Sequence, residues 1–213
     1  MYKNGSAARP PTRRLSPTFD NHDWWALDLK REDSPDWSRA VDIFCDRLRG
    51  RFIAPVDAIR EHSDSSIAAF AGFSVIAIDC LVIETLIQFY RGEDETSGKH
   101  DVAFVEFLRA SAYFSEEFDT KEKAKIFYSH FRCGILHQGQ TKRRSLIRYG
   151  MDRMVELVDA RRPWEGMILD RERFHVTLVQ ELTSYSTRIR NPRSERDRTM
   201  RTNFQKKMDI IAS

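Results

Sequence analysis

The chain has 213 residues, of which 41% are apolar and 31% charged, and its formal net charge is only +3. A chain of this length can bury one good core, and this composition is typical of a soluble globular protein. The net charge is too small to indicate nucleic-acid binding by itself. The three cysteines, Cys45, Cys80 and Cys133, form no Cys-x-x-Cys or Cys/His ligand pattern. Their spacing argues against a metal site or a disulfide framework and fits a reducing cytoplasm.

The N-terminal segment, residues 1–22, is rich in Pro, Arg, Ser and Thr and has no apolar period. We expect a disordered basic arm here, without the apolar stretch of a signal peptide. Trp24 and Trp25 could dock this arm onto the domain that follows, which we place at residues 23–190. Residues 191–213 are expected to form an arginine-rich C-terminal helix or tail.

Two long helices are predicted in the first half of this domain. Ser34 and Pro35 are typical of a helix start, and helical spacing of apolar residues then continues until Pro55, which should kink or interrupt the helix. A second helix is expected from the polar residues 63–66 to Arg91, just before a glycine.

The second helix contains an apolar stretch, residues 67–89, that is long enough to span a bilayer. However, Asp79 and Glu84 lie well inside it, and each would be costly in lipid. A buried core helix is therefore the better interpretation, and no membrane is expected as a partner.

A third helix is predicted over residues 101–114, and a fourth over about 120–138 with Gly139 at its end. In the fourth, one face carries an apolar stripe, namely Ala124, Phe127, Phe131 and Ile135. Short strands are then expected at 145–149 and 154–158, joined as a small β-hairpin, with a third apolar segment at 167–169. Asp170 should cap the next helix, which runs to about residue 189.

The run FYSHFRCGILHQG, residues 127–139, is the stretch that indicates chemistry. Arg132 could hold a phosphate, and His137 could move a proton. On an ideal helix the two side chains are about 140° apart and do not share a face. His130, seven residues before His137, would share its face and is a secondary candidate. For each histidine, a surface or capping role is the alternative.

Other residues could support this pair. Glu84 lies on the more polar strip of the second helix, where it could pair with Arg132, because a carboxylate in an apolar helix needs a cation or hydrogen bonds. Asp79 is the weaker candidate for that role. Lys142, Arg143 and Arg144 follow the motif directly and could bind nucleic acid, although they could equally be solvated surface charges.

The motif residues resemble the signature helix of the HEPN-domain family. The resemblance lies in the aromatic before Arg132, the apolar pair before His137 and the Gln-Gly after it, and it covers roughly residues 36–138. It implies a mainly α fold: a HEPN-like helical bundle, with the small β-hairpin and C-terminal helices appended. It also implies a homodimer with the two motif helices at its seam, and a carboxylate such as Glu84 that supports the arginine.

The activity implied by the resemblance is that of an endoribonuclease that needs neither a metal nor another cofactor. His137 would act as base on the RNA 2′-hydroxyl or as acid toward the leaving 5′-oxygen, and Arg132 would stabilise charge on the scissile phosphate. The setting would be defence or toxin–antitoxin biology, with an antitoxin or other regulatory protein as a partner. The alternative is a catalytically silent HEPN-like module that binds a protein or a nucleotide. The small net charge favours it, as does Cys133, where the family often has asparagine or another polar residue.

Overall fold

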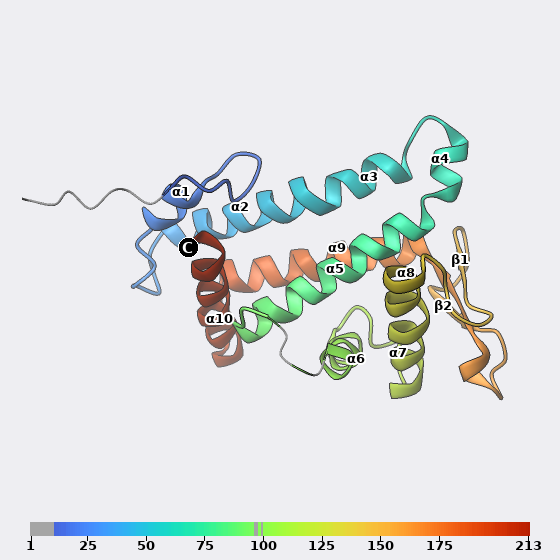
Figure 1. Ribbon diagram of the computed structural model, residues 1–213. Coiled ribbons are helices and arrows are strands. Elements are labelled where there is room, and N and C mark those ends of the chain that lie inside the picture. Colours follow the sequence, from blue (N-terminus) through green and yellow to red (C-terminus); the bar gives the residue numbers. More distant parts are fainter. Residues whose placement is uncertain (1–10, 96–97, 99) are drawn as a thin grey trace, which may run out of the picture.

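The protein is mainly α-helical, with a small three-stranded mixed sheet in its C-terminal half (Figure 1). The computed structural model describes residues 11–95, 98 and 100–213. Helix α5 (Gly72–Arg91) runs through the middle of the fold and packs against α9 (Arg171–Arg190). Helix α2 (Asp36–Leu48) packs on α9, while α10 (Glu195–Ala212) packs against both α5 and α9.

Residues 11–22 pack on the domain, which corrects the prediction of a disordered arm for this part; residues 1–10 lie outside the described residues. Leu15 is fully buried, and α1 (Asn21–Trp25) begins with a capping box at Asp20. The Trp24 indole donates a hydrogen bond to Asp209 at 2.8 Å, as its predicted docking role requires. The prediction failed because one or two anchoring apolar residues are enough to fix a short segment, yet they produce no period in the sequence.

Pro55 does not end the first long helix. The π-helical segment η1 (Arg49–Ile53) follows α2 directly, and α3 (Ala54–Arg60) continues from it. Pro55 lies in the first turn of α3. A π-helical turn is wider than an α-helical one. It therefore accommodates the proline ring and the absence of a backbone N–H at Pro55 without breaking the helical path.

The predicted second helix is divided in two. Asp64 caps α4 (Ser65–Phe70) by accepting a hydrogen bond from the Ser66 backbone, and a turn at Ala71 separates α4 from α5. Helix α5 ends as predicted, with Gly92 in the left-handed region at φ 65°. In the described residues, α5 alone is long and apolar enough to cross a membrane, and 56% of its apolar window is buried within this fold.

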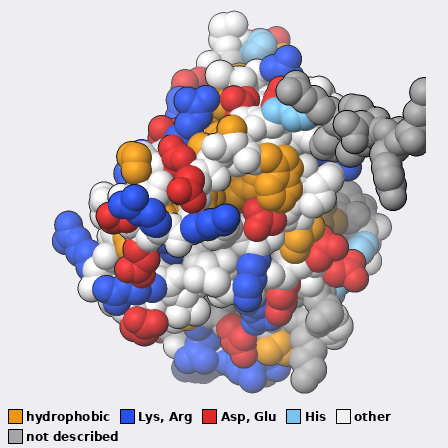
Figure 2. Space-filling model, turned by 90° about the vertical axis from the view of Figure 1, so that its left-hand side faces the viewer, with side chains coloured by type: hydrophobic (Ala, Val, Ile, Leu, Met, Phe, Trp, Pro, Cys, Tyr) orange, Lys and Arg blue, Asp and Glu red, His pale blue; other side chains and the backbone are white. Residues whose placement is uncertain are grey.

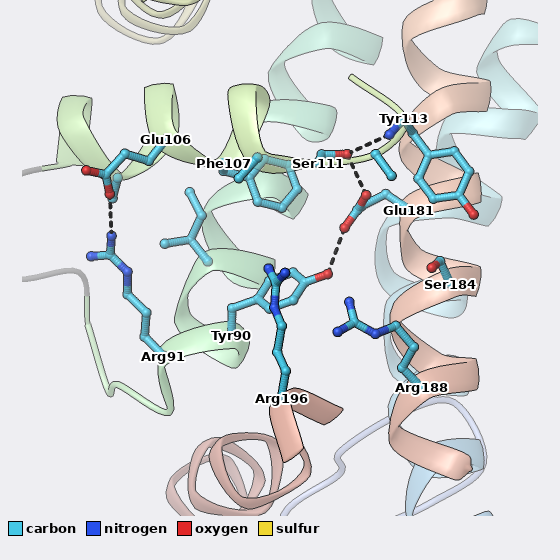
Figure 3. Close-up of a pocket in the computed structure, with 14 residues that line it drawn as sticks. Tyr90, Arg91, Glu106, Phe107, Ser111, Tyr113, Glu181, Ser184, Arg188 and Arg196 are labelled. Atoms are coloured by element: carbon cyan, nitrogen blue, oxygen red, sulfur yellow. Dashed lines mark hydrogen bonds and ion pairs between the residues drawn. The ribbon is translucent and has the colours of Figure 1, made fainter. Parts of the chain in front are cut away.

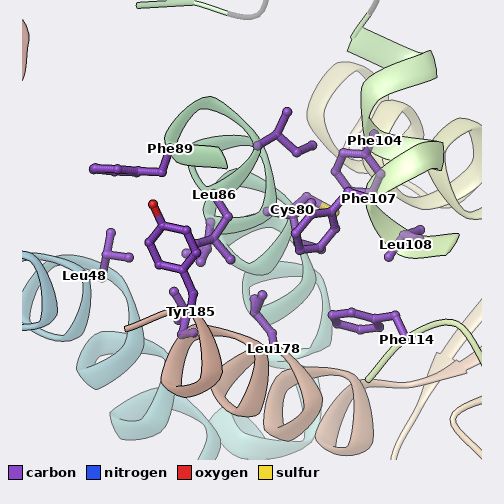
Figure 4. Packing of buried hydrophobic residues seen from close by; sticks show 14 of the residues in the cluster. Leu48, Cys80, Leu86, Phe89, Phe104, Phe107, Leu108, Phe114, Leu178 and Tyr185 are labelled. Carbon is purple, nitrogen blue, oxygen red and sulfur yellow. The ribbon is translucent and has the colours of Figure 1, made fainter. Parts of the chain in front are cut away.

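The core is built around α5, as Figure 4 shows. Phe89 of α5 packs edge-to-face on Phe44 of α2, with ring centroids 4.7 Å apart, and it also stacks with Phe204 of α10. Helix α10 is therefore part of the core and not a tail. Arg201 of α10 is only 6% exposed and donates to the backbone oxygens of Ile189 and Arg190, so it closes the end of α9.

Helix α6 (His100–Ala110) is shorter than predicted, and the sheet that follows α8 (Cys133–Gln138) differs from the expected hairpin. Strands β1 (Leu146–Arg148), β2 (Val155–Leu157) and β3 (Met167–Asp170) have the order β1-β3-β2. Strand β3 pairs in parallel with β1 and antiparallel with β2, so the hairpin prediction is wrong. Strand β3 takes the central place because Met167 and Leu169 are fully buried. The 3₁₀ turn η3 (Pro163–Glu165) leads into it.

Charged side chains of both signs are mixed on the face shown in Figure 2, around a small apolar area. Several arginines of the C-terminal region have acidic neighbours. These pairs are Arg188 with Asp197 at 2.6 Å, Arg190 with Asp42 at 2.7 Å and Arg198 with Glu32 at 3.2 Å. These arginines therefore do not form one continuous positive surface.

Candidate functional site

The motif lies on a helix with three consecutive parts: α7 (Lys121–Phe127), the π-helical segment η2 (Tyr128–Arg132) and α8 (Cys133–Gln138). Thr120 caps its start by accepting from the Lys123 backbone, and Gly139 ends it in the left-handed region at φ 62°. The predicted apolar stripe is buried against the core. The sequence did not predict the π-helical segment inside the motif, which ends at Arg132 and changes the direction of the side chains before it relative to those after it.

Arg132 and Glu84 form the predicted pair. The Nε and Nη2 atoms of Arg132 both lie 2.6 Å from Oε1 of Glu84, and the side chains are 16% and 25% exposed. The guanidinium also lies over the Tyr128 ring, 5.5 Å from its centroid. Arg132 is therefore fixed from two sides at the end of the π-helical segment.

The electrostatics of the pair follow from this geometry. Burial lowers the pKa of Arg132, but the adjacent Glu84 carboxylate outweighs that effect, so the pKa is raised. Burial raises the pKa of Tyr128 to about 12, even though the charge of Arg132 opposes the shift. Tyr128 is thus a neutral phenol beside a permanently charged guanidinium.

His137 lies in the last turn of α8 and is exposed to solvent. Among the residues that the structure describes, it has no side-chain hydrogen bond or ion pair, and no contact joins it to Arg132. Arg132 is the last residue of the π-helical segment, and the α-helical residues of α8 separate it from His137; regular helix geometry over five residues corresponds to an angle of about 140°. Within one chain they do not converge on one point.

His130 is buried, with 6% of its surface exposed, so it does not share an exposed face with His137. Its Nδ1 lies 2.9 Å from the Ser145 hydroxyl, and its backbone oxygen accepts from the Lys142 backbone at 3.0 Å. Burial and the nearby charges of Arg143 and Lys142 lower the pKa of His130, which keeps it neutral. Its position is that of a structural link between the motif helix and the sheet.

The basic residues after the motif lie on the connection between α8 and β1. Arg143 is exposed and has a left-handed backbone, with φ 54°. Arg144 is also exposed and pairs with Glu165 at 3.0 Å, while Lys142 is half-buried. A phosphate that reached this segment would therefore meet two cations without an acidic partner in the described residues, the half-buried Lys142 and the exposed Arg143.

Sequence reasoning missed a second cluster of ionisable groups. Asp79, considered above as a partner for Arg132, instead accepts a hydrogen bond from Nδ1 of protonated His175 at 2.8 Å, and both side chains are almost completely buried. His175 Nε2 lies 3.4 Å from Asp57, which in turn pairs with Arg60 at 2.6 Å. The cluster joins α3, α5 and α9. Because Asp79 and His175 are 96 residues apart, no local pattern could have revealed it.

A cavity beside Glu181 was also not anticipated. It has a volume of about 300 Å³ and lies between α5, α6 and α9 (Figure 3). Glu181, only 5% exposed, is at its wall. The sequence signal that could have pointed to it is a lone acid in the middle of the apolar face of α9.

Comparison of the chain with known protein families, with curated proteins and with solved structures finds no match.

Proposed function

We propose that the protein is a metal-independent endoribonuclease with a HEPN-like helical bundle. The observation that carries the proposal is the Arg132–Glu84 pair: a guanidinium held in a fixed orientation five residues before an exposed histidine. A pre-oriented guanidinium can stabilise the charge that develops on a phosphate during cleavage. The proposal rests on this geometry together with the resemblance of the motif.

In this mechanism His137 accepts the proton of the RNA 2′-hydroxyl, or gives a proton to the leaving 5′-oxygen. The 2′-oxygen attacks the adjacent phosphorus, the bond to the 5′-oxygen breaks, and the proton transfer that His137 does not perform takes place with solvent. The products are a 2′,3′-cyclic phosphate and a 5′-hydroxyl, and the reaction requires no metal and no water as a nucleophile in this step. Arg143 on the following segment is available to contact the RNA backbone.

The angle between Arg132 and His137 points to a cleft formed by two chains. If two motif helices face one another across a two-fold axis, Arg132 of one chain and His137 of the other can lie on the same phosphate. Leu136, which is 47% exposed beside His137, would be covered by such an interface. The proposal therefore includes a homodimer acting on RNA in the cytoplasm, with defence or toxin–antitoxin activity as its setting.

One assay tests the activity directly. The purified protein is incubated with a mixed RNA pool in the presence of EDTA, next to the His137→Ala variant. Cleavage that yields cyclic phosphate ends and is lost in the variant supports the proposal. Equal cleavage by both proteins would show that the activity does not belong to this site.

The alternative, a catalytically silent binding module, is favoured by one observation. Two of the three guanidinium nitrogens of Arg132 are close to Glu84, so the arginine already has a complete structural role. If the protein is such a binding module, neither the wild type nor the His137→Ala variant cleaves RNA in the assay.

A further inference from the structure

The cavity of about 300 Å³ beside Glu181 has walls of two kinds. One wall is apolar and includes Ile87, Ala103 and Phe107. The other carries Glu181 with its hydrogen-bond partners, and arginines stand at the mouth, as Figure 3 shows. A concave site that combines apolar walls with a few polar groups is typical of small-molecule binding.

Glu181 is a buried carboxylate whose direct partners are neutral. Its Oε1 accepts from the Tyr90 hydroxyl at 2.7 Å and its Oε2 accepts from the Ser111 hydroxyl at 2.6 Å. The direction of the second bond is fixed, because the Ser111 oxygen already accepts from the Tyr113 and Phe114 backbones. Burial and the negative charge of Glu181 raise the pKa of Tyr90, so its phenol also remains a donor.

Within the described part of the chain, no lysine, arginine or histidine nitrogen lies in ion-pair distance of the Glu181 carboxylate. A buried charge without a counter-charge is costly. Here the charge faces a cavity. A cationic group that entered the cavity would supply the missing counter-charge.

Positively charged side chains, opposite in sign to Glu181, lie at the mouth of the same cavity. Arg188 uses its Nε to bind Asp197 at 2.6 Å, which leaves its terminal nitrogens without a partner in the described residues. Arg196 is exposed and has no ion pair among those residues. Figure 3 shows both side chains extending toward Tyr90, and their charges oppose the rise in its pKa.

We propose that this cavity binds a free amino acid with an apolar side chain. The ammonium group lies on Glu181, the carboxylate lies at Arg188 and Arg196, and the side chain packs against Ile87 and Phe107. The volume is at the small end of the range for ligand sites, which suits an amino acid better than a larger metabolite. This site is separate from the motif of the proposed ribonuclease and does not depend on that function.

Calorimetric titration of the full chain with the aliphatic and aromatic amino acids tests the proposal. At least one of them should bind saturably, with one molecule per chain. The amide and the N-acetyl derivative of that amino acid each lack one of the two charges, and each should bind about tenfold more weakly or worse, since one charge-assisted hydrogen bond is lost.

Variants then place the ligand. Arg196→Gln should weaken binding about tenfold, whereas Arg198→Gln, an exposed arginine on the same helix that does not line the cavity, should leave it unchanged. Glu181→Gln should abolish binding, and its thermal unfolding shows whether the fold is retained. Because Arg196 is exposed, its variant stays informative even if Glu181→Gln unfolds.

Three results would overturn the assignment: no saturable binding by any of these amino acids at millimolar concentration, equal binding of the singly charged derivatives, or equal affinities of the Arg196→Gln and Arg198→Gln proteins. None of these results bears on RNA cleavage.

Discussion

Glu84 holds Arg132 through a single carboxylate oxygen, Oε1, which lies 2.6 Å from both Nε and Nη2 of the arginine. The two residues are 48 positions apart and belong to different helices, so the contact joins α5 to the motif helix. A link of this kind has a structural effect and, in the proposed enzyme, a catalytic one, because it sets where the guanidinium points.

The variant Glu84→Gln should therefore lower the free energy of unfolding by roughly 2 kcal/mol, since the charged donors of Arg132 lose a charged acceptor in a partly buried place. RNA cleavage should fall as well, because the arginine is no longer held in position. Urea unfolding and the cleavage assay measure the two effects.

Glu106→Gln is a matched control. Glu106 pairs with Arg91 on the surface, with side chains 64% and 38% exposed, and the loss of this pair should change the free energy of unfolding by less than about 1 kcal/mol. Equal effects of the two substitutions would show that the Glu84 pair has no special role.

The proposed shared cleft predicts that two inactive variants restore each other. In a mixture of Arg132→Ala and His137→Ala chains, each mixed dimer has one cleft with both residues intact and one cleft with neither. About a quarter of the wild-type cleavage should return if subunits exchange freely.

Each variant alone provides the baseline, and light scattering checks that dimers are present. If the mixture stays as inactive as its components although mixed dimers form, each cleft belongs to one chain. A fully active protein that is monomeric at tens of micromolar would also contradict the shared cleft.

Local signals in the sequence were enough for parts of the fold. The start of α9 follows from its Asp170 cap, and the ends of α5 and α8 follow from the left-handed glycines after them. These predictions succeeded because a cap or a glycine acts within one turn of the helix it ends.

Other features depend on contacts between residues far apart in the chain and could not be predicted from local sequence patterns. The central place of β3 depends on which apolar segment the core buries most deeply, not on the turn between β1 and β2. The burial of His130 depends on Ser145, and the Asp79–His175 pair depends on the packing of α5 against α9. The Arg132–Glu84 pair was accessible because an acid inside an apolar helix signals a need for a partner, and the motif supplied a candidate.

Gly134 is required by a close approach that the sequence did not indicate. A Cβ atom at this position would lie 2.6 Å from the backbone oxygen of Gln140, where the chain turns back after the motif helix. Gly134→Ala should thus destabilise the protein by about 1–3 kcal/mol and displace the segment that follows His137. Thermal unfolding measures the loss, and Ser129→Ala, at an exposed position of the same helix, is the control that should be nearly neutral. Similar unfolding temperatures for both variants would mean that the turn can move away at little cost.

The buried cluster around His175 predicts a dependence of stability on pH. Burial lowers the pKa of His175, but the bond to Asp79 outweighs it and the pKa is raised; burial also raises the pKa of Asp79. Both groups therefore bind protons more tightly in the folded than in the unfolded protein, and the free energy of unfolding must fall as pH rises through each folded pKa. The stabilisation that protonated His175 gives the folded protein is complete below its ordinary pKa of about 6.5, and it is lost as the pH rises above its raised pKa in the folded protein.

The variant His175→Gln separates this effect from other titrations. Near pH 6 it should be less stable than the wild type by roughly 3–5 kcal/mol, because Asp79 loses its cation in a fully buried place. As the pH rises toward about 9, wild-type His175 loses its proton and the difference between the two proteins should shrink. Urea unfolding of both proteins across this range measures the difference, and a double variant that also carries Asp79→Asn should regain part of the loss. A difference that stays constant or grows with pH would show that His175 is neutral in the folded protein and that the pair is an ordinary hydrogen bond.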